Sequence, residues 1–486
     1  MKKIYLILII LITAVSACTD KFEDFNTDKK HPLDVPGESL FSNAQKELSD
    51  YVNNTNVNIN IYKLMAQYWT ETTYTDEANY DLITRNIPAN TYLRLYMRVL
   101  TDLKQSAKLI NDKPVVFDSE KPVKQNKLQI IEMMNVYVYS QLVDVFGNIP
   151  YTEALDANNV YPKYDDAYTI YKNLFVRLDA ALAKLDANEA SFGSSDIYYG
   201  GDVASWVKFG NSLKIRMAIT ISDADNALAK SAVESAASKC FTSNDDNCLL
   251  NYVTSAPNYN QLYADLVASG RHDFVAANTI VDIMNSLNDP RLGSYFTKTD
   301  TSTVVGVEKL AYLGGEYGYQ SPFGQYSHIA DKIQKPDFAG IMLTYSEVQF
   351  FLAEAKERGY TLPKTAEAYY NEGIKASFDF WGTSGVDEYL LKPTVAYSTA
   401  TGTWKQKIGT QSWLANYTRG FEGYTTWRRL DYPLFNLPED ASTYSDIPVR
   451  FTYPVNEQTL NAEKYKAAST AIGGDFIKTK LFWDKF

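Results

Sequence analysis

The segment TYSEVQFFLAEAKERGYTLPKTAEAYYNEGIKASFDF, residues 344–380, is typical of two helices joined by a turn. The Thr344 hydroxyl can cap the first helix, and Glu347, three residues on, can reach back to complete a capping box. Gly359 ends this helix, and a second one is expected over 365–380. The apolar side chains of the first helix recur at three- and four-residue steps: Val348, Phe351, Leu352 and Ala355. The segment therefore predicts a helical hairpin with one buried face.

Further segments carry the same helical periodicity: 92–110, 126–146, 166–185 and 204–221. In the last of these, one face collects Trp206, Phe209, Leu213 and Met217. Paired helices of this size are similar to tetratricopeptide repeats, in which neighbouring hairpins bury each other's apolar faces. We therefore expect a mostly α fold, with tetratricopeptide-like helical hairpins mainly in residues 40–240 and 344–381.

Two long segments, about 241–343 and 382–470, lack a long helical period. Gly, Ser, Asn, Asp and Pro are scattered there among aromatic residues and short strand-like runs. Long irregular segments are uncommon inside a compact domain unless they carry function. We expect them to form an irregular, loop-rich ligand-binding half with a few short strands, packed against the hairpins.

The first eighteen residues are typical of a bacterial lipoprotein signal. Lys2 and Lys3 precede an apolar run that leads through small residues to Cys18. The run has about a dozen residues, whereas a membrane-spanning helix needs about 20. We expect residues 1–17 to be removed, Cys18 to carry lipid on its sulfur and amine, and the polar residues 18–35 to act as a tether. An ordinary secretion signal and a short buried helix are the alternatives.

Charge and composition indicate where the protein is located and which kinds of partner it can bind. The acidic residues after Cys18 are similar to the surface-export signal of Bacteroidota lipoproteins, although any solvated tether would look alike, and we expect an outer-membrane protein that faces outward. The 486 residues are 45% hydrophobic, enough for a sizeable core, and no later segment has 18 uninterrupted apolar residues. The formal charge of −11 becomes −13 once the signal's two lysines are removed, which argues against nucleic acid as a partner.

Cys240 and Cys248 flank a short polar loop. Export places them in an oxidising compartment, so we expect a disulfide between them, with two free buried thiols as the alternative. Two cysteines without a neighbouring histidine provide too few ligands for zinc. The loop between them lacks the alternating acidic spacing of a calcium loop, which leaves structural calcium an unsupported alternative. We expect no metal and no other cofactor.

Motifs of common enzyme classes are absent from the sequence. It has no H-E-x-x-H, no G-x-S-x-G, no Walker loop and no G-x-G-x-x-G after a strand. Only three histidines occur, His31, His272 and His328. The chain has 58 acidic residues, so it could still contain a carboxylate pair of the glycosidase kind, because the two partners need not be close in sequence. We expect a binding protein without catalytic residues.

Tyrosine is unusually frequent, with 37 Tyr against 23 Phe and 7 Trp. Its apolar ring and outward hydroxyl suit stacking on sugar rings, although most of these rings are expected to fill helix interfaces. The segments 68–80 and 316–328 place aromatic residues in turn-rich sequence beside amide and acid groups. They provide our candidate ligand-binding residues: Trp69, Tyr74, Tyr80, Tyr317, Tyr319 and Tyr326.

Several motifs resemble the SusD/RagB family of outer-membrane lipoproteins, especially its starch-binding branch. Besides the lipobox at Cys18 they are FGNIPYTEA (146–154), WVKFGNSLKIRMA (206–218), DPRL (289–292), SEVQFFLAEA (346–355) and PVRFTYPVNE (448–457). The resemblance covers nearly the whole chain and implies a single SusD-like domain over 36–486. It also implies a non-enzymatic lid over a SusC-like TonB-dependent transporter. Ligand-contacting loops diverge in the family, so the resemblance transfers no site residue.

The sequence therefore predicts a surface lipoprotein that captures oligosaccharides and delivers them to a SusC-like TonB-dependent transporter. Peptide capture by the same kind of complex is an alternative, since relatives in the family also serve peptide importers and an acidic protein suits cationic peptides. A glycoside hydrolase built on helical hairpins, or a purely structural lipoprotein, would belong to a different class.

Overall fold

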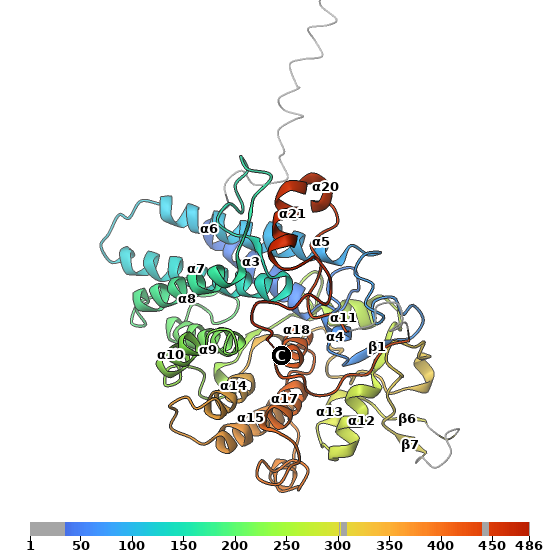
Figure 1. The fold of residues 1–486 in the computed structure, drawn as a ribbon. Coiled ribbons are helices and arrows are strands. Elements are labelled where there is room, and N and C mark those ends of the chain that lie inside the picture. The colour runs from blue at the N-terminus through green and yellow to red at the C-terminus, as the bar shows by residue number, and fades with distance from the viewer. Residues whose placement is uncertain (1–34, 301, 303–308, 440–446, 486) are drawn as a thin grey trace, which may run out of the picture.

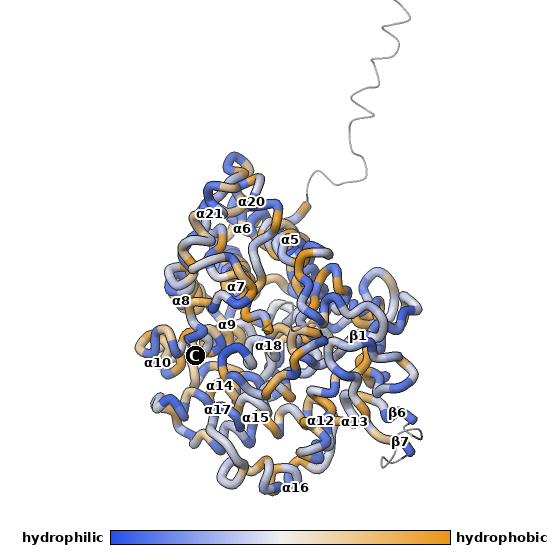
Figure 2. Tube along the Cα trace, turned by 45° about the vertical axis from the view of Figure 1, so that its right-hand side comes forward, coloured by the Kyte–Doolittle hydropathy of each residue, from blue (hydrophilic) through white to orange (hydrophobic). Residues whose placement is uncertain are grey.

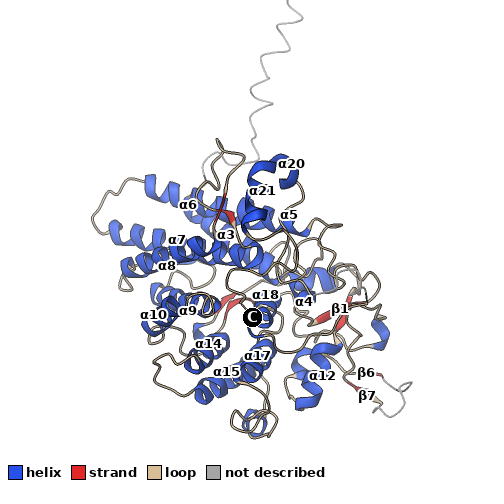
Figure 3. Cartoon of the chain, viewed as in Figure 1, coloured by secondary structure: helices blue, strands red, loops and turns tan. Residues whose placement is uncertain are grey.

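The computed structural model describes residues 35–300, 302, 309–439 and 447–485. The predicted signal at 1–17, Cys18 and nearly all of the predicted tether lie outside the described residues. In the described part most of the regular structure is helical, and the strands are short (Figure 3). The mostly α fold that the sequence predicts is confirmed.

Helices packed in pairs form one half of the molecule. The pairs are α3 (Gly37–Asn53) with α6 (Thr101–Asp112), α7 (Glu120–Phe146) with α8 (Ala167–Lys184), α9 (Val203–Thr220) with α10 (Asn226–Ala236), and α14 (Tyr345–Glu357) with α15 (Ala366–Trp381). Figure 1 shows them one below the other along the left side. The predicted helices in this half end within a few residues of the observed ones.

Side-chain caps fix where these helices begin. Aspartates start three of them by accepting a hydrogen bond from the backbone N–H three residues on, at 2.8–3.0 Å: Asp166, Asp202 and Asp225. Thr344 starts α14, because its Oγ1 accepts from the Glu347 N–H at 3.3 Å. The second half of the predicted capping box is wrong. The Glu347 carboxylate is buried and pairs with Arg216 and Arg419, at 2.9 and 2.6 Å, and these cations hold its pKa below the usual range.

The helix predicted over 92–110 is divided into segments of different kinds. It starts as α5 (Ile87–Tyr92), continues as a π-helix over Leu93–Leu100, and ends as α6. Of the residues expected on its inner side, Leu95, Val99 and Leu103 are buried and Leu109 is half-buried. The periodicity identified most of the buried face, but it did not reveal the π-helical stretch, a form that is rare in proteins.

Short antiparallel strand pairs lie in the loop-rich half and, in one case, between α7 and α8. They are β1 (Trp69–Glu71) with β5 (Phe274–Ala276), β2 (Ile149–Pro150) with β3 (Tyr164–Asp165), β4 (Cys248–Leu250) with β8 (Gly340–Leu343), and β6 (Thr299–Asp300) with β7 (Leu310–Ala311). Short helices connect them: α4 (Tyr62–Met65), α11 (Gln261–Tyr263), α12 (Asn278–Leu287), α13 (Leu292–Tyr295), α16 (Val386–Leu390), α20 (Glu457–Leu460) and α21 (Ala462–Ala471). In Figure 1, β1, β6, β7 and α12 lie on the right.

Two well-formed helices lie inside the segment 382–470 that we expected to be irregular. They are α17 (Trp404–Ala415) and α18 (Gly420–Leu430), which pack on each other, and α17 also packs on α14. The buried side of α18 mixes the apolar Phe421, Tyr424 and Leu430 with the charged Glu422, Arg428 and Arg429. Arg429 pairs there with Glu354 of α14 at 2.9 Å. The charged residues among the buried positions obscure the hydrophobic period of this helix in the sequence.

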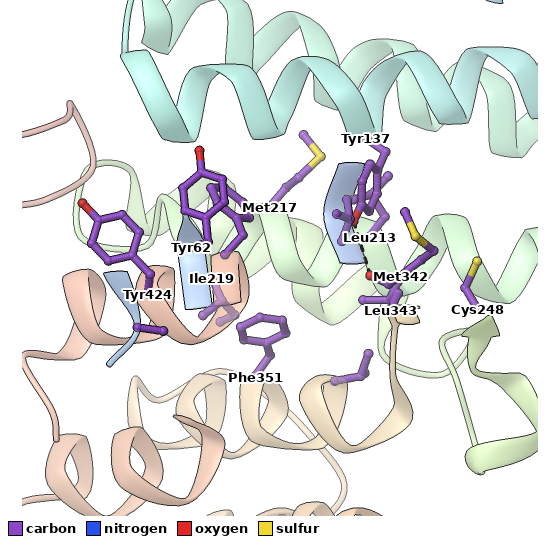
Figure 4. Close-up of a cluster of buried hydrophobic side chains, with 14 of the residues drawn as sticks. Tyr62, Tyr137, Leu213, Met217, Ile219, Cys248, Met342, Leu343, Phe351 and Tyr424 are labelled. Atoms are coloured by element: carbon purple, nitrogen blue, oxygen red, sulfur yellow. Dashed lines mark hydrogen bonds between the residues drawn. The ribbon is translucent and has the colours of Figure 1, made fainter. Parts of the chain in front are cut away.

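A continuous buried core joins the two halves. Figure 4 shows part of it, with Tyr62 and Tyr424 from the loop-rich half beside Met217 and Ile219 of α9 and Phe351 of α14. In the same view a hydrogen bond links Tyr137 of α7 to the main chain of β8: the Tyr137 hydroxyl donates to the Met342 carbonyl oxygen at 3.3 Å. The halves therefore share one hydrophobic interior.

Apolar and polar residues alternate along the helices in Figure 2. None of the helices in the described ranges is long and apolar enough to cross a membrane.

The predicted disulfide is wrong: Cys240 and Cys248 are free thiols, and both are buried. Cys240 follows α10, where its Sγ lies 3.3 Å from the Ala237 carbonyl oxygen. Cys248 belongs to β4 and is paired in register with Leu343 of β8. Between them Asp246 folds the loop by accepting from the Thr242 N–H and hydroxyl at 2.7 and 2.8 Å. Backbone pairing and this carboxylate define the loop without a covalent link.

Candidate functional site

Three loops meet beside the small sheet formed by β1 and β5. They cover residues 72–80, 269–273 and 316–328, and we call them the platform loops. The first follows β1 and the second precedes β5, and the pairing of Glu71 with Phe274 brings them side by side. Thr72 ties them together, because its N–H donates to the Asp273 carbonyl oxygen at 2.9 Å and its hydroxyl to that of His272 at 2.7 Å.

Three hydrogen bonds connect the third loop to the first loop and to β1, which precedes it. The Asn79 side chain donates to the Gly318 carbonyl oxygen at 2.7 Å, and the Gln320 side chain donates to that of Thr73 at 2.8 Å. The Ser321 N–H donates to the Glu71 carbonyl oxygen at 3.2 Å. The two aromatic segments that the sequence singled out, 68–80 and 316–328, thus form one surface region.

A stack of three rings, which we call the platform, lies across these loops. His272 and Phe323 stack with ring centroids 4.2 Å apart and an interplanar angle of 23°. Phe323 and His328 stack at 3.7 Å and 12°. His328 Nε2 donates to the Phe323 carbonyl oxygen at 2.7 Å, which fixes the ring orientation. The two imidazoles cover both faces of Phe323, and His272 is exposed while the other two rings are half-buried, so His272 is the ring of the stack that is open to solvent.

Polar and aromatic groups border the platform. Arg271 and Asp273, which flank His272, form an ion pair with Arg271 Nη2 and Asp273 Oδ1 2.8 Å apart, and both are exposed or half-exposed. Tyr74 is 64% exposed. The hydrogen bond and the charge of Asp273, with a smaller contribution from Tyr74, raise the pKa of the Arg271 guanidinium. Stacking rings with hydrogen-bonding groups at their edge are suited to a ligand with flat apolar faces and equatorial hydroxyls.

Three of the six predicted ligand contacts are buried and cannot touch a ligand: Trp69, Tyr80 and Tyr317. Trp69 Nε1 donates to the Tyr417 hydroxyl at 3.0 Å, and the Tyr317 hydroxyl donates to the Leu64 carbonyl oxygen at 2.9 Å. The Tyr80 and Tyr317 rings lie 6.1 Å apart, one from each of two platform loops. The prediction that these three residues contact a ligand is therefore wrong, and their buried side chains support the loops instead. Tyr74 is exposed, and Tyr319 and Tyr326 are partly exposed.

A buried carboxyl pair lies under the first platform loop. Burial, followed by the charge of Glu77, raises the pKa of Glu71 to about 9. Glu71 Oε2 accepts from the Ala78 N–H at 2.9 Å, and Glu77 pairs with Arg85. Both carboxyls are shielded from solvent. Because glycosidase carboxyls must flank a bound substrate, this pair organises the loop and is not placed for hydrolysis.

Metal ligation finds no support in the described part of the chain, where no group of three or more His, Cys, Asp or Glu could hold an ion. In the loop considered for calcium, Lys208 Nζ lies 2.6 Å from Asp246 Oδ1. The other oxygen of Asp246 accepts from Thr242. Protein donors therefore occupy the carboxylate.

Sequence reasoning missed the platform itself. Phe323 and His328 lie in a segment that we selected for its tyrosines, and His272 lies about 50 positions earlier. Two of the chain's three histidines stack on the same phenylalanine, yet no spacing rule links residues so far apart. The only available signal was the turn-rich, aromatic character of the segment 316–328.

Comparison with known proteins supports a single family. A family model described as starch-binding and associating with the outer membrane, SusD-like, matches residues 29–454. A search of curated proteins gave no significant match. A solved structure of a chitin-binding protein is 26% identical, with 93% of this chain and 100% of that chain covered at a TM-score of 0.80. A SusD homologue from Bacteroides uniformis is also 26% identical, with 93% and 99% covered at 0.74. A chitin-binding SusD homologue from Flavobacterium johnsoniae is 24% identical, with 92% and 97% covered at 0.75.

Proposed function

The chain belongs to the SusD-like family of starch-binding, outer-membrane-associated proteins, and on that premise we propose that it captures oligosaccharides at the His272–Phe323–His328 platform. The stack of three rings across the platform loops is the observation that supports this proposal. A pyranose ring offers an apolar face that packs on aromatic carbon, while its hydroxyls reach polar groups at the edge. Tyr74, Arg271 and Asp273 provide such an edge.

We propose oligosaccharides of N-acetylglucosamine as the first ligands to test. One of the two relatives that are 26% identical is a chitin-binding protein. The family description names starch, so malto-oligosaccharides are the natural comparison. Both are neutral, which suits a chain with a formal charge of −11. The exposed Arg271–Asp273 pair offers donors and acceptors to hydroxyl and acetamido groups alike.

Delivery to a transporter completes the proposed function. Cys18 would carry the lipid that holds the domain at the outer membrane, facing outward, and a SusC-like TonB-dependent transporter would receive the glycan. The protein would carry out no chemistry of its own. In support, Glu71 and Glu77, the two carboxyls under the first platform loop, are buried.

Calorimetric titration with chitohexaose and with maltohexaose tests the ligand site. We expect Tyr74→Ala and His272→Ala each to weaken binding of the preferred glycan by about three- to tenfold, the effect of losing one stacking partner. We expect Phe323→Ala to weaken it to a similar extent, because it removes the ring on which His272 stacks. Tyr161→Ala is the matched control, because Tyr161 is 54% exposed but lies outside the platform loops. We expect the control to bind like the wild type.

The same samples separate the alternatives. Unchanged affinity in all three platform variants would place the glycan elsewhere on the protein. Reducing ends that accumulate over hours would indicate a hydrolase. Binding of a lysine-rich peptide, with neither glycan bound, would favour peptide capture, which the acidic composition suits.

A further inference from the structure

A groove of about 720 Å³ lies between the start of α3, the end of α6 and the start of α7. Figure 1 shows these helices side by side, and α6 packs on both of the others. Val116 and Phe117, which directly follow Val115 of the lining, are 72% and 67% exposed. Exposed apolar side chains gathered around a hollow are characteristic of an interaction site. The apolar part of the lining includes Val35, Leu109, Ile110, Pro114, Val115 and Val123.

Polar contacts between the three helices hold the walls of this groove in place. Lys124 Nζ donates to the carbonyl oxygens of Asn111 and Lys113, at 2.6 and 2.9 Å, and so ties α7 to the end of α6. Lys127 Nζ of α7 lies 2.7 Å from Glu38 Oε1 of α3. The groove is therefore preformed, and a preformed groove loses little entropy when a segment binds in it.

The described chain begins inside this groove, because its first residue, Val35, is part of the lining. Two positions later Gly37 packs so closely on α6 that a Cβ there would lie 2.8 Å from Ile110 Cγ1. The Ser106 hydroxyl donates to the Gly37 carbonyl oxygen at 2.7 Å and fixes this contact. The segment 18–34, which precedes Val35 in the sequence, is therefore attached to the body of the protein at the groove.

The attached segment matches the groove in apolar character and in charge. Residues 20–28, DKFEDFNTD, contain two phenylalanines, Phe22 and Phe25, and four acidic residues against one lysine, a formal charge of −3. The lining has three lysines against two glutamates, a local excess of positive charge in a chain whose formal charge is −11. Opposite charges favour the pairing, and the apolar lining suits phenylalanine rings. The charged lining residues are Glu38, Lys113, Glu120, Lys124 and Lys127.

The length of the segment allows it to reach back into the groove. Ten positions separate Phe25 from Val35, a span of at most about 35 Å, whereas the whole of α6 is only about 18 Å long. A segment tied to the groove by so short a connection meets it at an effective concentration on the order of millimolar. A free partner would have to compete with this segment.

Other occupants fit the groove less well. A second copy, packed symmetrically, would bring the same excess of lysines together. An anionic lipid surface would meet the acidic Asp118 and Glu120 beside the exposed Val116 and Phe117. A hollow also accepts a narrow chain segment more readily than a broad membrane surface, which needs protruding apolar groups.

We propose that residues 20–28 of the same chain dock in this groove, with the Phe22 and Phe25 rings on its apolar lining and the acidic side chains beside its lysines. Docking would shorten the tether. Four positions separate Cys18 from Phe22, a reach of at most about 15 Å, against at most about 60 Å for the 17 positions from Cys18 to Val35. This consequence rests on the lipidation of Cys18 in the proposed function, whereas the docking itself does not. The groove would set how far the domain stands from the membrane.

Photo-crosslinking tests the docking directly. A chain that begins at position 18, with Cys18→Ser, carries a photoreactive phenylalanine in place of Phe22 or Phe25, and mass spectrometry locates the crosslinks. We expect both probes to crosslink to residues 109–124. Mixing isotopically labelled and unlabelled chains shows whether a crosslink joins parts of one molecule, as we expect, or two copies.

Substitutions in the groove provide the control for these crosslinks. We expect Val115→Glu, Val123→Glu to lower their yield about tenfold or more, because carboxylates replace apolar contacts and repel an acidic segment. Val176→Glu is the matched control, since Val176 is 66% exposed on α8 and lies outside the groove. It should leave the yield unchanged. A missing groove crosslink in the unsubstituted groove would overturn the proposal, as would crosslinks between two copies or an equal yield in both groove variants.

A second measurement changes only the tether and leaves the described residues of the groove as they are. Nitroxide labels at Asn26→Cys and Lys121→Cys report the distance between segment and groove by electron–electron resonance, and the buried native thiols stay unlabelled. We expect one narrow distance distribution. Adding Phe22→Ser, Phe25→Ser should broaden it about twofold or more, toward that of a flexible chain. Adding Thr19→Ser, Thr27→Ser should not. Equal widths with and without the phenylalanines would contradict the docking.

The same probes in the native chain in intact cells, together with glycan titration, separate this proposal from the proposed function. Crosslinks to lipid or to another protein, in place of the groove, would overturn the docking. Phe22→Ser, Phe25→Ser lies outside the platform loops and should bind chitohexaose or maltohexaose with wild-type affinity. Groove crosslinks without lipid on Cys18 would support the docking and contradict the proposed anchor, whereas a lipidated Cys18 without groove crosslinks would do the reverse.

Discussion

The helical pairs and the platform loops are held together by contacts of different range. In the helical half, caps such as Asp166 act over three residues, and apolar stripes pack neighbouring helices. In the loop-rich half, side chains join segments that are hundreds of positions apart. Trp69, for example, is hydrogen-bonded to Tyr417, and Gln67 to Asn436. The difference teaches that the scaffold is encoded locally, whereas the binding surface depends on the completed fold.

A buried ion pair at the boundary of the two halves offers the strongest test of that difference. Arg291 and Asp289, from the loop-rich half, are fully buried with Arg291 Nη2 and Asp289 Oδ2 2.6 Å apart. Arg291 also donates to Ser377 of α15 and to Gln411 of α17, at 3.0 and 2.8 Å. We expect Arg291→Met to lower the free energy of unfolding by about 3–5 kcal/mol, because it leaves an unpaired carboxylate in the core. Urea unfolding followed by circular dichroism measures the change.

Two controls show whether the buried charge is the cause. Lys108→Met removes the exposed pair with Asp112 and should change the stability by less than about 0.5 kcal/mol. Adding Asp289→Asn to Arg291→Met should recover part of the lost stability, since the orphaned charge disappears. An unfolding curve for Arg291→Met that overlays the wild type would contradict a structural role of this pair.

A substitution at Gly420 tests the close contact between α18 and α4, the helix that leads into β1 beside the platform loops. A Cβ added there would lie 2.4 Å from the Lys63 backbone nitrogen and 2.4 Å from the Tyr62 carbonyl carbon. An alanine inside a helix is normally favourable by about 1 kcal/mol, but here α4 must move away, and α4 leads into β1. We expect Gly420→Ala to destabilise the protein by about 1–3 kcal/mol and to weaken glycan binding.

The control for this prediction lies in a platform loop. A Cβ at Gly324 would meet nothing within 4 Å, so Gly324→Ala should keep both the stability and the affinity of the wild type. Thermal unfolding and calorimetric titration of the two variants give the comparison. Equal behaviour of Gly420→Ala and Gly324→Ala would show that the close approach of α18 and α4 is dispensable.

The sequence predicted the scaffold well because its signals are short in range. The helix expected over 166–185 is observed as Ala167–Lys184, and that expected over 204–221 as Val203–Thr220. In each case an aspartate cap precedes an apolar stripe. Helix α18 was not predicted, because its buried side mixes apolar residues with Arg428 and Arg429, which find partners only in the folded protein.

The candidate site could be predicted only at the level of segments. Turn-rich aromatic sequence identified two of the three platform loops, yet it could not tell that Tyr74 is exposed while Tyr317 is buried. The burial of Tyr317 depends on its bond to Leu64, 253 positions away. No local pattern contains that information, and the same holds for the stacking of His272 on Phe323.

The buried carboxyl pair beneath the platform predicts a pH dependence of a definite sign. The folded pKa of Glu71, about 9, lies above its ordinary value of 4.5. The unfolded chain therefore binds fewer protons between these values, and the contribution of Glu71 to stability falls as pH rises from about 4.5 to about 9. Glu71→Gln keeps the neutral form, so the variant should gain stability relative to the wild type across this window. Urea midpoints at pH 5, 7 and 9 measure the difference, and a constant difference would contradict the assignment.

The smallest expected effect concerns the point where the helical half passes into the loop-rich half, at Cys240 and Cys248. If local contacts alone define this junction, a reducing agent should leave the melting temperature unchanged. Burial raises the pKa of the Cys240 thiol to about 11 and also raises that of Cys248, so little reactive thiolate forms at neutral pH. In a Cys18→Ser chain, Ellman's reagent should therefore detect no rapidly reacting thiol in the native protein and two in the unfolded, unreduced protein. Fewer than two reactive thiols in the unfolded protein would reveal a disulfide. The junction would then be held by a covalent bond, unlike the helical pairs.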